Sequence, residues 1–378
     1  MRGRTGLDFL KDLDLAEEPL AVSCKHALAE LKTQCGGPDC FPPWRDLAVF
    51  ARRKAQSFFS KKVDKNLQAS LLESLDVEGK VRVRSCGGPL ASGWQTASPS
   101  SLAGRMTDDE YSVTARALLG QQLVATAGSR CRNRRLTRAA AGTECGVLLD
   151  SDARHCYCCA VGGGLKTRST AVVAAIERCH RQCGLSTARE VHVAQWDRWK
   201  WSCQSPACSN HGVAETRPSG ACPTCGGDSV VSREEAVLDL EVRGPEVPVS
   251  YLDVCVHHSV PCDAVRLLKA SKADGEVAKE AARTKHTRYP AHRSQWRMVP
   301  LAFETFGRLG REGLEYLRTL ARQAAARVAD DGEVDPSALL SQFGCSVSVA
   351  LQRANVANIR KSVGPVFAVD ALLLAEAT

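Results

Sequence analysis

The stretch EEAVLDLEVRGPEVPVSYLDVCVH, from Glu234 to His257, predicts two adjacent strands joined by a turn. Asp239 and Asp253 each lie seven residues from Glu246, at the centre of the turn-rich run GPEVP. The two aspartates should therefore face each other across the hairpin. Period-two alternation places them on a polar face and an apolar set on the opposite face, namely Leu238, Leu240, Val242, Leu252, Val254 and Val256.

Two opposed carboxylates on neighbouring strands repel each other unless a cation lies between them or one of them takes up a proton. Carboxylate oxygens are hard ligands that suit Mg²⁺ or Mn²⁺. A solvated strand face would also accommodate Asp239 and Asp253, because charged residues are usually exposed. The segments around the hairpin favour the metal site.

The segments upstream of the hairpin predict a helix and a further strand. Arg168 to Cys183 is amphipathic, and its inward positions are Val172, Val173, Ile176 and either Cys179 or Cys183. Glu190 to Trp196 alternates in the manner of a strand. With the hairpin, these segments make one helix followed by three strands.

The segments downstream of the hairpin predict a second helix and a last strand. Asp263 to Arg288 reads as a helix, which Gly275 could divide in two, and Met298 to Phe303 reads as a short buried strand. Lys285 and Tyr289 have i, i+4 spacing and therefore share a helix face. The predicted fold class is α/β (α+β), in the order helix, three strands, helix, strand. With acids on the middle strands and a lysine nearby, this order is typical of metal-dependent nucleases.

Several stretches resemble the C-terminal region of reverse-transcriptase-associated proteins. These are abundant in algal and dinoflagellate genomes and are related to non-LTR retrotransposons with a restriction-like endonuclease. The similar stretches are EEAVLDLEV, SYLDVCVHHSVPC, EVAKEAARTKHTRYP, VPLAFETFGRLGREG, RSCGGPLASGWQTASP, MTDDEYSVTARALLG, CGVLLDSDARHCYCCAVGGG and SVALQRANVANIRK. The resemblance runs from about Val81 to Lys361 and implies a restriction-endonuclease-like core.

The resemblance also implies which residues carry the chemistry. The candidates are Asp239 and Asp253 as metal carboxylates, Lys285 as the catalytic lysine, Tyr289 as its neighbour, and Glu190 or Glu235 as a third acid. Two positions depart from the family pattern: Thr284 stands where an acid is expected, and Ser169 stands where histidine is usual. These departures favour a nuclease-like remnant that has lost catalysis, whereas the aspartate pair and Lys285 favour an active enzyme.

Eighteen cysteines in a chain expected to be intracellular predict metal ligands or buried thiols rather than disulfides. The clearest set has a CxxxxC pair followed after thirteen residues by a CxxC pair, and consists of Cys203, Cys208, Cys222 and Cys225. Four thiolates on two such turns predict a closed tetrahedral zinc site, in which His211 could replace Cys208. This zinc module interrupts the nuclease core as an insertion.

A second cluster lies upstream, with CxC and HxxxC spacings that permit several ligand sets or simply buried thiols. The resemblance favours a second zinc site of the CCHC type, with Cys131, Cys145, His155 and Cys159 as ligands. The adjacent run SRCRNRRLTR (129–138) is rich in arginine and has no acid. In isolation such a run favours a solvated face, whereas its position next to the cysteine cluster strengthens the case for contact with nucleic acid phosphates.

The composition is that of an ordinary globular protein with a modest positive bias, since 50 Lys and Arg face 42 Asp and Glu. We expect a nucleic acid partner, which by the resemblance is DNA. An alternative that the sequence favours less is a protein-interaction adaptor that binds through the zinc module. No polymerase core can be read in the chain, so a reverse transcriptase would act in trans. The sequence does not indicate an oligomeric state.

The predicted organisation has four parts. They are a helical region 1–80, a basic Cys/His region 81–165, a nuclease-like core 166–310 with the zinc module at 199–228, and C-terminal helices 311–378. No apolar run reaches the roughly 20 residues that span a bilayer, and the N-terminus carries too many charges for a secretory signal. We therefore expect an intracellular, nuclear protein with no membrane partner.

Overall fold

The computed structural model describes residues 26, 29–34, 36, 55–100, 104–123, 129–136, 141–245, 247–328 and 334–364. Two compact units divide the chain after Gly79. In the first unit, helix α4 (Ala55–Ser74) carries the basic residues Lys61, Lys62 and Lys65, and Asn66 donates a hydrogen bond of 3.0 Å to the carbonyl of Gln34. Most of the remaining predicted helical region 1–80 lies outside the described residues.

A four-stranded sheet forms the centre of the second unit, with strand order β1-β5-β6-β7. Its strands are β1 (Ser186–His192), β5 (Val237–Gly244), β6 (Val247–His257) and β7 (Arg297–Glu304). The first three strands are antiparallel, and β7 runs parallel to β6. Leu240 pairs with Leu252, which is the hairpin register expected from symmetry about Glu246. The predicted mixed α/β class is confirmed.

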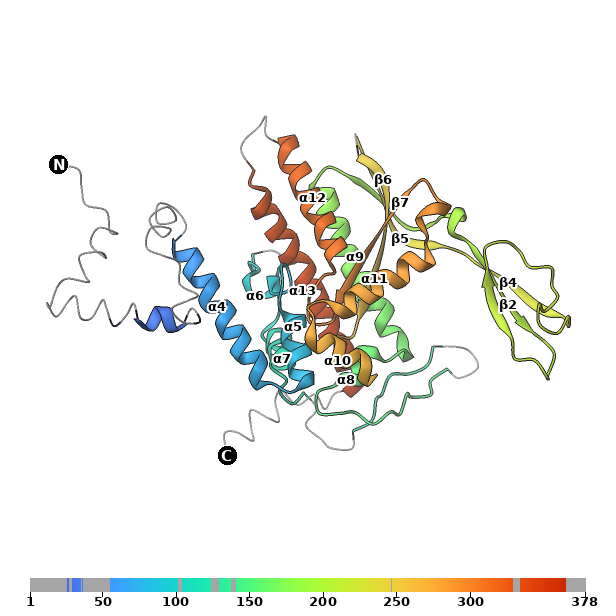
Figure 1. Ribbon diagram of the computed structural model, residues 1–378, viewed down its shortest axis with the longest axis horizontal. Helices are drawn as coiled ribbons and strands as arrows, with labels where there is room; N and C mark the ends of the chain where they lie inside the picture. The colour runs from blue at the N-terminus through green and yellow to red at the C-terminus, as the bar shows by residue number, and fades with distance from the viewer. Residues whose placement is uncertain are drawn as a thin grey trace. The chain divides into compact units, whose positions relative to one another are not determined.

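One face of this sheet is covered by three helices, α9 (Gly164–Gln182), α12 (Arg311–Val328) and α13 (Pro336–Val363) (Figure 1). The apolar side chains that meet there include Val172 and Ile176 of α9, and Leu240, Leu252 and Leu301 of the strands. The inward face predicted for α9 is the buried face in the structure.

The opposite face is covered by α11 (Glu276–Arg288), which follows α10 (Ala264–Lys272). Ala278 and Ala281 of α11 pack against Ala302 of β7, and these small side chains let the helix lie close to the strand. Gly275 separates the two helices with a positive φ of 69°, a conformation that glycine adopts readily. The predicted helix 263–288 is therefore divided in two at Gly275, as its sequence allowed.

Two predicted element boundaries are wrong. The strand expected at Glu190–Trp196 begins earlier, at Ser186, and Trp196 belongs to a 3₁₀ turn. The polar residues at the start of β1 gave no alternating signal.

Among the C-terminal helices expected in 311–378, α13 is one continuous helix from Pro336 to Val363. Gly344 does not interrupt this helix. Its lack of a side chain instead lets another segment pack closely against the helix. A Cβ atom there would lie 2.6 Å from Leu90, so a larger residue would clash with the segment that precedes α6 (Gly93–Thr96).

The division between the two units falls at the first residue of the Gly-, Pro- and Ser-containing segment 79–98. The rest of the segment is packed rather than a linker. It includes α6 and the C-terminal part of α5 (Val77–Cys86), and Val81, Ala91 and Trp94 are buried. The predicted divisions after residues 165 and 310 lie inside the second unit.

A second sheet, of order β3-β2-β4, is inserted in the sequence between β1 and β5, which are neighbours in the main sheet. Its strands are β2 (Arg198–Cys203), β3 (His211–Ala214) and β4 (Ser229–Glu234), and it extends away from the four-stranded sheet (Figure 1). We call residues 198–234 the arm. It is longer than the predicted insertion 199–228, because β4 pairs with β2 along its whole length.

Candidate carboxylate site and candidate metal centres

Asp239, Asp253 and Lys285 come together on the face of the sheet that α11 covers. The Lys285 Nζ lies 2.7 Å from Asp253 Oδ2, and the Asp253 side chain is buried. Asp239 Oδ2 accepts a hydrogen bond of 2.6 Å from the backbone N–H of Val254. Burial and then the negative charge of Asp253 raise the pKa of Asp239 to about 6. Although burial alone would lower it, the pKa of Lys285 is raised by its ion pair with Asp253. The site thus holds two carboxylates against one ammonium.

Tyr289 follows α11 directly and is buried. Its ring centroid lies 5.7 Å from that of Trp196, and the guanidinium of Arg288 lies 4.9 Å from the Tyr289 ring centroid. Burial and then the charge of Asp253 raise the pKa of Tyr289, so its hydroxyl is protonated at neutral pH. Tyr289 therefore joins the carboxylate site to the base of the arm by packing.

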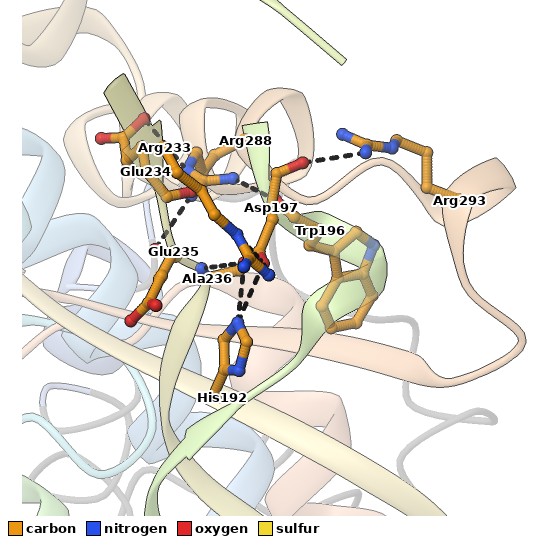
Figure 2. A network of polar contacts seen from close by, with 9 residues as sticks. All are labelled: His192, Trp196, Asp197, Arg233, Glu234, Glu235, Ala236, Arg288 and Arg293. Carbon is orange, nitrogen blue, oxygen red and sulfur yellow. Dashed lines mark hydrogen bonds and ion pairs between the residues drawn. The ribbon is translucent and has the colours of Figure 1, made fainter. Parts of the chain in front are cut away.

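The two candidate third acids are both exposed. Glu190 has a positive φ of 51°, and its carboxylate lies 3.8 Å from Lys166 Nζ. Its neighbours Arg189 and Val191 pair with Leu240 and Leu238, so Glu190 lies across the strands from Asp239. The Glu235 carboxylate points away from Asp197 into solvent (Figure 2).

The two positions that depart from the family pattern both make backbone hydrogen bonds. Thr284 is exposed, and its hydroxyl donates to the carbonyl of Glu280 at 3.1 Å. The Ser169 hydroxyl donates to the carbonyl of Val254 at 3.2 Å. Val254 is therefore held by Ser169 at its carbonyl and by Asp239 at its N–H, next to Asp253.

Glu304, the last residue of β7, caps the helix that carries Lys285. It is buried, and its Oε1 accepts a hydrogen bond of 3.2 Å from the N–H of Ala278 in the first turn of α11. Gly275 has no side chain for this role. A carboxylate at a helix N-terminus satisfies free N–H groups and complements the helix dipole. The sequence did not reveal this contact, because the residues are 26 apart.

The four cysteines of the arm converge at its far end. Cys203 Sγ lies 3.5 Å from Cys225 Sγ, and Cys208 Sγ lies 3.8 Å from Cys222 Sγ. Four sulfurs at the usual Zn–S distance from one ion would be separated by about 3.8 Å. The N–H groups of Cys225 and Thr224 lower the pKa of Cys222 to about 6, which favours the thiolate that zinc requires. This set fits a tetrahedral zinc ion.

His211 is not needed in that set, because the four sulfurs already complete it. The His211 ring instead lies 3.2 Å from the carbonyl of Ser209, through Nδ1.

The second cysteine cluster is also assembled. Cys131 and Cys145 each place Sγ 3.8 Å from Cys159 Sγ, and His155 Nε2 lies 3.4 Å from Cys145 Sγ. These separations fit three sulfurs and one imidazole nitrogen around a single zinc ion, for which an S···N distance of about 3.5 Å is expected. These two groups are the metal-ligand clusters found among the described residues.

Asp197 links the arm to the sheet. It is buried and accepts hydrogen bonds from the N–H of Ala236 (2.7 Å), Nε of Arg233 (2.9 Å) and Nε2 of His192 (3.0 Å) (Figure 2). Burial would raise the pKa of Asp197, but these three donors hold it below its usual value. The carboxylate therefore stays charged and ties the strand that enters the arm to the strand that leaves it.

Arg288, three residues after Lys285, makes a second link. Its guanidinium donates to the carbonyls of Trp196 (2.6 Å), Glu235 (3.3 Å) and Glu234 (3.4 Å) (Figure 2). Neither Asp197 nor Arg288 was identified from the sequence. The only feature of the sequence that pointed to Arg288 was its position between Lys285 and Tyr289.

Comparisons of the chain with models of protein families, with curated proteins and with solved structures gave no match. None of the described helices combines the length and apolar character that a membrane crossing requires. The chemistry proposed below therefore rests on the geometry and on the resemblance noted in the sequence.

Proposed function

We propose that this chain is a metal-dependent endonuclease with a restriction-like core, acting on DNA. The observation that carries the proposal is the 2.7 Å approach of Lys285 Nζ to Asp253, beside Asp239 on the adjacent strand. These residues come from two strands and a helix. A lysine far from the carboxylates could not have oriented the same water molecule that a metal held by them would activate. The order α9, β1, β5, β6, α11, β7 matches the expected core once the arm is set aside.

The donor set fits a hard divalent cation. Two carboxylates, one of them buried, face a single ammonium, and the raised pKa of Asp239 reflects this excess of negative charge as well as burial. Asp239 and Asp253 would hold Mg²⁺ or Mn²⁺, which when bound polarises the phosphodiester and its attacking water. Glu190, across the strands from Asp239, is the candidate third carboxylate. It would have to leave its exposed ion pair with Lys166, which contributes little.

Lys285 supplies a positive hydrogen-bond donor in the same place. Its amine is fixed by Asp253 and stays protonated, so its role is to orient a water or to stabilise a phosphate oxygen. Tyr289 and Glu304 position the helix from its two ends. Thr284, next to Lys285 in the chain, is exposed, and its hydroxyl bonds to a backbone carbonyl rather than to Asp239 or Asp253.

The region of the second cysteine cluster offers a surface for the nucleic acid backbone. Residues 129–136 alternate, so that Cys131 and Asn133 are buried while Arg130, Arg132 and Arg134 are exposed. Arginines in such a row bind phosphates without reading sequence. This supports a nucleic acid partner, and the resemblance adds a reverse transcriptase in trans and a nuclear location.

A plasmid assay tests the proposal. Purified protein with Mg²⁺ or Mn²⁺ should nick supercoiled DNA, and Asp253→Asn and Lys285→Met should each lower the rate by about a hundredfold or more, because several kcal/mol of transition-state stabilisation are lost. Asp108→Asn, an exposed acid on α7 (Asp108–Leu119), is the charge-matched control and should nick at the wild-type rate. Nicking that survives Asp253→Asn would exclude this site as the catalytic one.

A second candidate function is that of a nucleic-acid-binding remnant without catalysis. The observation that favours it is that both candidate third acids, Glu190 and Glu235, are exposed. Absence of nicking together with DNA binding that weakens steeply with salt, and that Arg132→Gln reduces, would establish this function instead.

A further inference from the structure

Two side chains at the end of α11, Lys285 and Arg288, contact different parts of the molecule. Lys285 reaches Asp253 in the sheet, and Arg288 reaches the carbonyls of Trp196, Glu234 and Glu235 at the base of the arm (Figure 2). The N–H of Tyr289 donates to the carbonyl of Lys285 at 2.8 Å, so both side chains belong to one hydrogen-bonded turn.

The carbonyls that Arg288 binds come from two separate parts of the chain. Trp196 precedes the arm, whereas Glu234 is the last residue of β4 and Glu235 follows it, so Glu234 lies 38 positions after Trp196. They are neighbours because β2 pairs with β4, beginning with Arg198 opposite Glu234. A planar guanidinium can bind both segments at once only while this pairing persists.

Asp197 strengthens the same junction. It connects Arg233 of β4, and Ala236 just after that strand, to His192 of β1. Its own carbonyl accepts a hydrogen bond of 2.9 Å from Arg293, beyond α11. Two points after Lys285 are therefore anchored to the base of the arm, the end of α11 by Arg288 and the following segment by Arg293.

We propose that Arg288 and Asp197 are positioning residues through which a folded, zinc-loaded arm holds Lys285 against Asp253. The arm is a small sheet whose far end is closed by four cysteines, so losing its metal releases the β2–β4 pairing. Arg288 then loses its partners, the final turn of α11 frays, and the Lys285 amine leaves the carboxylate. The catalytic consequence rests on the proposed nuclease function, but the structural consequence does not.

The test measures the reactivity of the Lys285 amine, by acetic anhydride labelling of the full chain and mass spectrometry of the peptides. Cys225→Ser, Arg288→Met and treatment of the wild type with a zinc chelator should each raise Lys285 labelling by about tenfold, because the amine then lacks the charged contact with Asp253 that shields it. Labelling of Lys279, an exposed lysine on the same helix, should not change. Arg283→Met, at an exposed arginine of α11, is the matched control and should label like the wild type.

Double variants identify the route. Adding Cys225→Ser to Arg288→Met should raise Lys285 labelling no further, because the link is already broken. If Arg288→Met does not fold, Asp197→Asn replaces it, with a smaller increase expected. Lys285 labelling that stays at the wild-type value in zinc-free Cys225→Ser would overturn the inference.

The same variants separate this inference from the proposed function. If the wild type nicks DNA, Arg288→Met should lower kcat about tenfold with KM little changed, since Arg288 does not contact the carboxylates. If the wild type does not nick, the nuclease proposal fails while the labelling results still decide whether the arm positions Lys285.

Discussion

The two cysteine clusters have the same metal chemistry in opposite surroundings. Cys131 and Cys159 are buried within a hydrophobic cluster that also contains Cys156, Tyr157 and Val356 of α13. In the arm, by contrast, none of the described residues between 197 and 235 belongs to a buried hydrophobic cluster. Metal at the first site would supplement a core, whereas metal at the arm would replace one.

The largest effect should follow from removing a ligand of the arm. Cys225→Ser should abolish the protection of β2–β4 amides against hydrogen exchange, because a structural zinc contributes on the order of 10 kcal/mol to such a module. The zinc content should fall by one per chain. The control is Cys262→Ser, at an exposed cysteine outside both clusters. Retained protection of the arm amides in a metal-free variant would show that the arm has another source of stability.

A smaller effect should follow from the matching change in the buried cluster. Cys159→Ser should remove the second zinc and lower the free energy of unfolding by about 2–4 kcal/mol, because a buried group loses its partners while the surrounding apolar packing remains. Urea denaturation measures this, with Cys158→Ser, an exposed cysteine next in the chain, as the control. Complete unfolding of Cys159→Ser would make the two clusters alike and remove the contrast.

The smallest effect should come from pH at the base of the arm. The hydrogen bond from Arg198, followed by that from Lys200, lowers the pKa of Glu234 to about 2. Because the folded pKa is below the ordinary value, the stabilisation is present above about pH 4.5 and is lost as the pH falls toward 2. We expect about 1–2 kcal/mol after allowing for screening by solvent.

Hydrogen exchange of the arm between pH 6 and 3, corrected for intrinsic rates, measures this loss. Glu234→Gln should remove the pH dependence, and Glu215→Gln, an exposed acid of the arm, should leave it. A pH dependence that survives Glu234→Gln would locate the titrating group elsewhere.

The features that the sequence predicted best were those set by local rules. Equal spacing about Glu246 predicted the Leu240–Leu252 register, and ligand spacing predicted the Cys203 set, because both depend on turns between near neighbours. Clear periodicity likewise located α9 and β7 to within a few residues.

The contacts that escaped prediction join segments far apart in the chain. Arg288 binds carbonyls of Trp196 and Glu234, and nothing in a single sequence distinguishes such an arginine from a solvated one. The proximity of Lys285 to Asp253 was an expectation of the family resemblance alone, since the hairpin and the helix end are linked only through the tertiary fold.

The cap that Glu304 provides to α11 has a consequence for the order in which the protein is made. Lys285 is synthesised before Glu304, and β7, which ends at Glu304, must also pair in parallel with β6. On the ribosome, the helix that carries Lys285 would thus lack its N-terminal anchor until residue 304 has emerged. A nascent chain interrupted before that point would contain both aspartates and the lysine in sequence, but would not hold them in place.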